Sequence, residues 1–105
     1  MKELYEKHAE LCKTLAHPKR LEILNFLRDG EKSVNELVGK MGISQSNISQ
    51  HLAILRQNNI VATKRKGKNI YYTLAYPEMS HACDIIRNVL IKQLKENSSL
   101  IKKSR

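Results

Sequence analysis

The chain of 105 residues has few aromatic side chains, because Trp is absent and Phe and Tyr together make up 5% of it. This scarcity argues against a base-stacking platform for single-stranded nucleic acid. No apolar run approaches 18 residues and no signal-peptide core is present, which predicts a cytoplasmic protein that neither spans a membrane nor is secreted. The sequence also lacks a glycine-rich phosphate loop and any motif that pairs a nucleophile with a base, which argues against an enzyme.

Acidic residues are scarce in one part of the chain. The net charge is +9, and residues 57–76 contain four Lys or Arg and no Asp or Glu. These cations form the cluster KRKGK (Lys64, Arg65, Lys66 and Lys68), and a second basic segment, KKSR, occupies residues 102–105. With 41% hydrophobic residues the chain is an ordinary globular one. We therefore expect a single domain, 1–105, that binds a polyanion.

Apolar residues recur at helical spacing through most of the chain. The segments that show this spacing, or that a capping signal opens, are 3–16, 18–29, 33–41, 44–58 and 77–97. Pro18 suits the first turn of the second segment, and Ser33 with Glu36 has the S-x-x-E spacing of a capping box. Gly42 can end the third helix and Ser44 can cap the fourth. Five helices are therefore predicted.

Between residues 60 and 74 the pattern alternates instead. Residues 60–63 and 69–74 read as two strands, and Lys66, Gly67 and Lys68 between them read as a hairpin turn with a positive tip. A short helix, a glycine turn and a second helix followed by a basic hairpin are typical of a winged helix-turn-helix. The sequence thus predicts a mainly α fold with a helix-turn-helix at 33–56 and a wing of two or three strands at 60–74.

The helix that begins at SQSNISQHL has a polar, uncharged outer face. Ile48, Leu52 and Leu55 are expected to face the core, which turns short hydrogen-bonding side chains outward. Such side chains suit a recognition helix, because Gln and Asn can pair bidentately with adenine in the major groove. The candidate base contacts are Ser44, Gln45, Ser46, Asn47, Ser49, Gln50 and His51. Lys64, Arg65, Lys66 and Lys68 of the wing would neutralise phosphates, which positions the protein without reading sequence.

Three segments carry a resemblance to a known family: LAHPKRLEIL, GISQSNISQHLAILRQNNIV and KRKGKNIYYTL. They resemble the signature segments of the ArsR/SmtB-type winged-helix repressors. The resemblance implies a homodimer joined through the first and last helices (1–16 and 77–97). It also implies binding to an inverted-repeat operator in double-stranded DNA, and repression until a metal ion or a redox signal releases it. The apolar stripe from Met79 to Leu94 independently needs a partner.

The chain departs from this family at its two best-known metal sites. Ser33 and Asn35 stand where one site has cysteines. At the second site His81 alone matches, because the remaining ligand positions hold Met79, Lys92 and Lys95. One ligand of four does not hold zinc.

Cys12 and Cys83, the only two cysteines, are left as sensor candidates. Both could be small core hydrophobes. They could also form a dithiol switch, in which oxidation or a polysulfide bridge distorts the interface and weakens DNA binding. A third interpretation is a site for Zn or a softer ion built from His8, Cys12, His81 and Cys83.

The prediction is therefore a homodimeric DNA-binding transcriptional regulator, a repressor of an inverted-repeat operator, released by a thiol-directed signal or a metal ion. No cofactor is certain, and a Zn or soft metal ion is the one candidate. The alternative from a different class is a winged-helix protein without an inducer site, which acts as a protein interaction or chromatin-type module. The hydrogen-bonding face of 44–51 argues against this alternative, because DNA compaction requires charge and no base readout.

Overall fold

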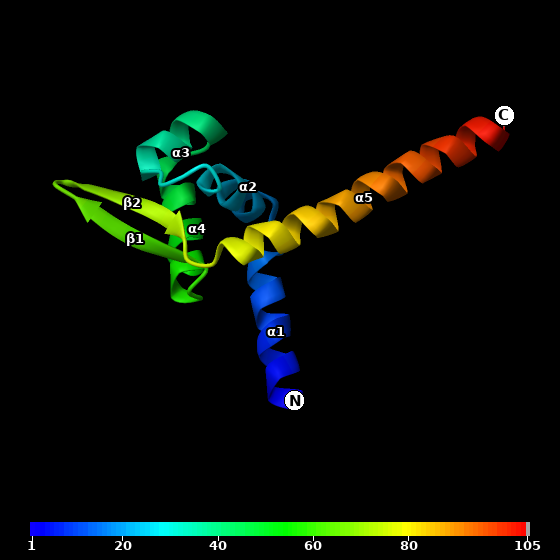
Figure 1. The fold of residues 1–105 in the computed structure, drawn as a ribbon. Helices are drawn as coiled ribbons and strands as arrows, with labels where there is room; N and C mark the ends of the chain where they lie inside the picture. Colours follow the sequence, from blue (N-terminus) through cyan, green and yellow to red (C-terminus); the bar gives the residue numbers. More distant parts are fainter. Residues whose placement is uncertain (105) are drawn as a thin grey trace.

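The computed structural model describes the backbone of residues 1–104 and the side chains of residues 1–98 (Figure 1). The elements are α1 (Lys2–Leu15), α2 (Pro18–Leu27), α3 (Val34–Met41), α4 (Gln45–Gln57), β1 (Val61–Lys66), β2 (Asn69–Leu74) and α5 (Pro77–Ser104). Five helices and one antiparallel hairpin confirm the predicted winged helix-turn-helix. The side chains of the basic tail at 102–105 lie outside the described residues.

The two helices of the helix-turn-helix begin and end at the capping residues that the sequence predicted. Ser33 and Glu36 form the capping box, with the Glu36 N–H donating to Ser33 Oγ at 3.1 Å and the Ser33 N–H donating to Glu36 Oε1 at 3.2 Å. Gly42 ends α3 with φ of 65°, a left-handed conformation that glycine adopts at little cost. Ser44 then caps α4 by accepting the Asn47 N–H at 3.2 Å. These caps determine where α4 begins and how its first turn is oriented relative to α3.

The core lies where α2, α3 and α4 meet the base of the hairpin. Its buried side chains are Ile23, Leu24, Leu27, Leu37, Ile48, Leu52, Leu55, Ile60 and Val61. The predicted inward face of α4 is confirmed, because Ile48, Leu52 and Leu55 are fully buried. This packing fixes the rotation of α4 about its axis, so its opposite face stays in solvent.

The first strand of the wing extends further than the predicted 60–63, although the wing as a whole lies within the predicted 60–74. Lys66 pairs with Asn69 at the end of the ladder, so β1 continues through the basic cluster and the turn is only Gly67 and Lys68. The expectation that Lys66 belongs to the turn is therefore wrong. Both strands are exposed near the tip, so no apolar alternation marks them there. An isolated bridge between Lys32 and Tyr72 adds one residue pair beside β2, and the sheet of the described residues has two strands.

Helices α1 and α5 project from the body in different directions (Figure 1). The radius of gyration is 16.8 Å, whereas a compact domain of 100 residues measures about 13 Å. Helix α5 continues to Ser104 and corrects the expected end near residue 97, because Ser costs a helix only about 0.5 kcal/mol and does not stop it. No helix of the described residues is apolar over a stretch long enough to cross a membrane.

Candidate DNA-binding surface and thiol groove

The outer face of α4 carries the polar side chains that the sequence singled out. Residues 44–47, 49 and 50 are all exposed, on the side opposite the buried leucines and isoleucine. Ser44 differs from the others because its hydroxyl oxygen already accepts the capping hydrogen bond. The side chains free to meet a ligand at this face are therefore Gln45, Ser46, Asn47, Ser49 and Gln50.

His51 occupies a different position from the rest of the set. Its ring lies 4.5 Å from the ring of His17, centroid to centroid, and its Nδ1 accepts a hydrogen bond from Arg20 Nε at 3.2 Å. Arg20 also donates from Nη1 to the backbone oxygen of Thr14 at 3.0 Å. The His51 ring thus joins α4 to α2 and to the end of α1. It is not part of the exposed polar face.

Burial, followed by the charges of His17 and Arg20, lowers the pKa of His51 below its ordinary value. An unfolded histidine titrates near pH 6.5, so below that value the unfolded chain binds this proton more readily than the folded chain does. The stability contributed by neutral His51 is complete above about pH 6.5 and is lost as the pH falls through the folded pKa. We expect the free energy of unfolding, measured in urea, to decline as the pH falls from about 7.5 to 5.5. His51→Gln should make this decline smaller, and an unchanged decline in the variant would contradict the assignment.

The cations of the wing do not all have the same surroundings. Lys64, Arg65 and Lys68 are exposed and form no ion pair with any described residue, whereas Lys66 is paired with Glu31. The wing also meets the recognition helix, because Lys68 and Gln45 line one hollow of about 310 Å³. The other residues of this hollow are Ser33, Val34, Asn35, Asn69, Ile70 and Tyr71. Asn35, Asn69 and Tyr71 were missed by the sequence, since no local pattern brings the start of α3 to the hairpin.

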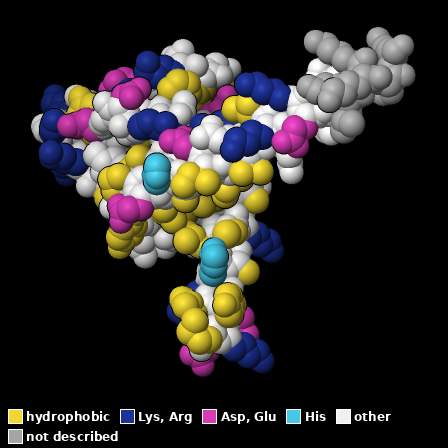
Figure 2. Space-filling model, turned by 45° about the vertical axis from the view of Figure 1, so that its right-hand side comes forward, with side chains coloured by type: hydrophobic (Ala, Val, Ile, Leu, Met, Phe, Trp, Pro, Cys, Tyr) yellow, Lys and Arg dark blue, Asp and Glu magenta, His cyan; other side chains and the backbone are white. Residues whose placement is uncertain are grey.

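Large apolar side chains are exposed along α5 and at the start of α1. On α5 they are Ile85, Ile86, Val89, Leu90, Ile91 and Leu94, with Ile86 69% exposed. On α1, Leu4 and Tyr5 are also exposed. Figure 2 shows hydrophobic side chains gathered where α1 meets α5 and continuing toward the N-terminus. A patch this continuous marks an interaction surface.

Both cysteines open into one apolar groove between α1 and α5. The groove has a volume of about 360 Å³, and its lining comprises Cys12, Leu15, Ala16, Leu21, Cys83, Ile86, Arg87 and Leu90. Cys12 is exposed and Cys83 is half-buried, and neither belongs to the core. Of the three interpretations left open, the one with both cysteines in the core does not describe the single chain, where α1 projects from the body (Figure 1) and leaves Cys12 exposed.

The four metal-ligand candidates are not gathered into a site within one chain. His8 and His81 are exposed, and among the described residues no three His, Cys, Asp or Glu side chains are placed to hold a metal ion. A zinc site needs at least three protein ligands. A metal ion bound at Cys12 and Cys83 would thus require ligands from a second subunit.

An ion-pair network ties α5 to the body, which the sequence pattern did not reveal. Asp84 Oδ1 accepts hydrogen bonds from Arg28, at the end of α2, and from Arg87, one turn along α5. The hydrogen bond from Arg28, followed by the positive charges around it, holds the pKa of Asp84 below its ordinary value. The network thus links the first turns of α5 to the end of α2.

Known proteins share this architecture over nearly the whole chain. The crystal structure of Rv0081 from Mycobacterium tuberculosis superposes with a TM-score of 0.81 at 39% identity, over 90% of this chain and 95% of that one. The biofilm growth-associated repressor of Xylella fastidiosa is 39% identical over 84% of this chain and 77% of its own length. The homodimeric winged helix-turn-helix DNA-binding domain of Mb0332 from Mycobacterium bovis superposes with a TM-score of 0.80 at 26% identity, over 90% and 88% of the two chains.

The family model described as "Bacterial regulatory protein, arsR family" matches residues 17–63. This segment runs from the cap of α2 into β1 and includes the whole helix-turn-helix. Two of these relatives are 39% identical to the chain over 84% and 90% of its length. Together with the family model, this likeness identifies the family. The protein belongs to the ArsR family of bacterial regulatory proteins.

Proposed function

We propose that the protein is a homodimeric repressor that binds an inverted-repeat operator in double-stranded DNA. The observation that carries this proposal is the outer face of α4, where exposed, uncharged hydrogen-bonding side chains are held in place by the buried Ile48, Leu52 and Leu55. A helix with this face can enter the major groove and pair with base edges. The cations of the wing supply contacts to phosphates, which orient the domain on the duplex.

The dimer is supported by the exposed apolar surface of α1 and α5. Burying this surface between two chains would remove it from water at about 25 cal/mol per Å². A two-fold axis through α5 would place two copies of α4 on one face of the duplex, and successive major grooves are about 34 Å apart. The domain from Mycobacterium bovis is homodimeric and the protein from Xylella fastidiosa is a repressor. These similarities support both parts of the proposal.

Selection from random duplex DNA tests this function. The purified protein should enrich sequences that share two inverted half-sites, and a reporter driven from the enriched site should lose expression when the protein is present. Uniform binding to all sequences would instead support the chromatin-type alternative. Absence of DNA binding, or an increase in reporter expression, would contradict repression.

We further propose that modification of the groove thiols releases the DNA. Cys12 and Cys83 line one groove between α1 and α5, the two proposed dimerisation helices. A change in the shape of this groove would therefore alter the angle between the subunits. Oxidation by peroxide would join the two sulfur atoms, with two protons and two electrons passing to the peroxide to give water. A metal ion is the weaker alternative, since it would need ligands from both subunits.

A comparison of the protein with its Cys12→Ser and Cys83→Ser variants tests this release. After treatment with peroxide or polysulfide, the mass of the wild-type protein should change and its affinity for the operator should fall at least about tenfold, or 1.4 kcal/mol. Each Ser variant should bind the operator with normal affinity, and the treatment should leave this affinity unchanged. An unchanged affinity in the modified wild-type protein, or equal responses in all three proteins, would contradict the thiol switch, and a response to zinc alone would favour the metal ion.

A further inference from the structure

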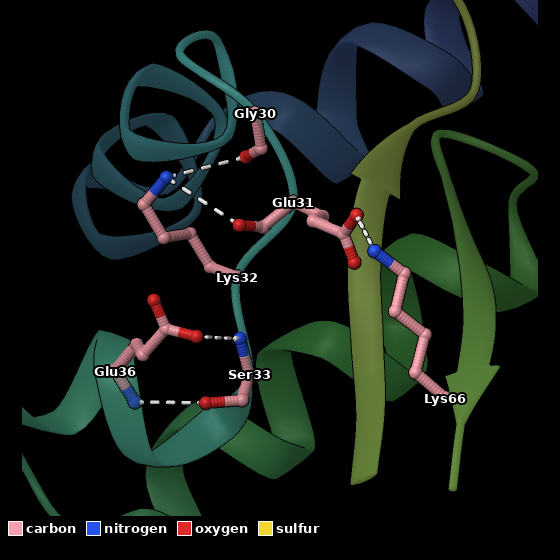
Figure 3. A network of polar contacts seen from close by, with 6 residues as sticks. All are labelled: Gly30, Glu31, Lys32, Ser33, Glu36 and Lys66. Atoms are coloured by element: carbon pink, nitrogen blue, oxygen red, sulfur yellow. Dashed lines mark hydrogen bonds and ion pairs between the residues drawn. The ribbon is translucent and has the colours of Figure 1, made fainter.

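Glu31 and Lys66 join two distant parts of the domain. Glu31 lies in the connection between α2 and α3, and its Oε1 is 2.6 Å from the Nζ of Lys66 on β1 (Figure 3). Oε2 of the same carboxylate is buried and has no hydrogen-bond partner among the described residues. Its side chain is 28% exposed, whereas that of Lys66 is 54% exposed. One oxygen of the carboxylate is thus shielded from solvent, while the other binds Lys66 at the partly exposed edge of the wing.

The backbone that follows Glu31 is held by hydrogen bonds to the wing and to α3. Lys32 and Tyr72 exchange two hydrogen bonds, from the Lys32 N–H to the Tyr72 oxygen at 3.1 Å and from the Tyr72 N–H to the Lys32 oxygen at 2.8 Å. Ser33, one residue further, is fixed by the capping box of α3. The segment that presents Glu31 is therefore bound to both the wing and the helix-turn-helix.

Lys66 has a second contact that keeps it on the wing. Its Nζ lies 5.6 Å from the centroid of the Tyr71 ring on β2, within range of a cation–π interaction. The hydrogen bond to Glu31 is the main cause that raises the pKa of Lys66, and the same bond lowers the pKa of Glu31. Both groups therefore stay ionised at neutral pH, and each neutralises the other.

We propose that Glu31 is a positioning residue for the wing, which braces the hairpin through Lys66 and withholds this ammonium group from DNA phosphates. Lys64, Arg65 and Lys68 are then the cations of the cluster that neutralise phosphates. Each neutralised phosphate strengthens binding to all sequences alike, so withholding one cation lowers the sequence-independent part of the affinity. This inference depends on the proposed DNA-binding function.

The dependence of DNA affinity on salt concentration tests whether Lys66 differs from the other wing cations in its contact with phosphates. Arg65→Ala should flatten the slope of log K against log salt by about 0.9, the value for one lost phosphate contact. Lys66→Ala should leave the slope unchanged. Glu31→Gln should steepen it by about 0.9, with stronger binding to a scrambled duplex, because Lys66 becomes free. Glu22→Gln removes the same charge and also releases an exposed lysine, Lys19, but on α2 rather than on the wing. It serves as the control that leaves the slope unchanged.

Two results would overturn the inference. One is a slope in Lys66→Ala that flattens as much as in Arg65→Ala, since Lys66 would then be an ordinary phosphate contact. The other is a slope in Glu31→Gln equal to that of the wild-type protein. Circular dichroism of each variant checks the fold, and the Lys66→Ala result stands even if Glu31→Gln fails to fold. A wild-type protein that does not bind DNA would contradict the proposed function instead.

Discussion

Leu90→Glu should convert the protein into a monomer and weaken binding to the operator by about 10²- to 10⁴-fold. Leu90 lies in the exposed apolar stripe of α5 and is 52% exposed in the single chain. A carboxylate there would be buried without a partner in the proposed dimer, which is far more costly than its exposure in a monomer. Two monomers bind the two half-sites independently. The second binding event then no longer gains from the high effective concentration that a dimer provides. Sedimentation equilibrium and a gel-shift titration measure the two effects.

Asn88→Glu is the matched control for this variant. It adds the same charge two positions away, on the other side of α5, because residues i and i+2 of a helix do not share a face. The control should remain dimeric and bind the operator normally. Leu90 contributes nothing to the core of the single chain, so circular dichroism should show that both variants fold. Leu90→Glu should unfold at the lower urea concentration, because it alone loses the stability that dimerisation contributes. A dimeric Leu90→Glu protein would contradict the assignment of α5 as the dimer interface.

Gln45→Ala should cost about 1–3 kcal/mol of operator affinity, the value of a bidentate contact to a base. Gln45 is the first residue of α4 and is exposed beside the hollow that it shares with Lys68. The loss should appear at one base pair of each half-site. The protein should discriminate less among bases at this pair, and its base preference at the other pairs should be unchanged. Binding to a panel of single-base operator variants measures the effect.

Gln57→Ala provides the control for Gln45→Ala. Gln57 is also exposed, but it lies at the last turn of α4, away from the face proposed to meet base edges. Its replacement should leave both affinity and sequence preference unchanged. If Gln45→Ala weakened binding equally on every DNA, α4 would contact phosphates only and would not read bases.

Local signals in the sequence predicted the fold well, because each depends on neighbouring residues. Pro18 at the first turn of α2, the Ser33 capping box and the left-handed Gly42 all lie where the sequence placed them. The buried face of α4 was predicted for the same reason, since Ile48 and Leu52 are one helical turn apart. Such signals determine the exposed face that carries the proposed function.

The contacts that the sequence missed join residues far apart in the chain. Glu31 and Lys66 are 35 positions apart, Arg20 and His51 are 31 apart, and Arg28 and Asp84 are 56 apart. No period or motif identifies such partners, because they meet only after the helices have packed. Nothing in the sequence therefore indicated that His51 accepts a hydrogen bond from Arg20, or that Lys66 pairs with Glu31.

A hydroxyl-radical footprint on the selected operator tests most directly the proposal that a dimer reads two half-sites through α4. Two chains per duplex should protect two half-sites related by a two-fold axis, with their centres about 10 base pairs apart. Additional protection should appear where each wing meets the flanking backbone. A single protected half-site at saturation, or one chain per duplex, would contradict the dimer, and uniform protection along the duplex would contradict sequence-specific reading by α4.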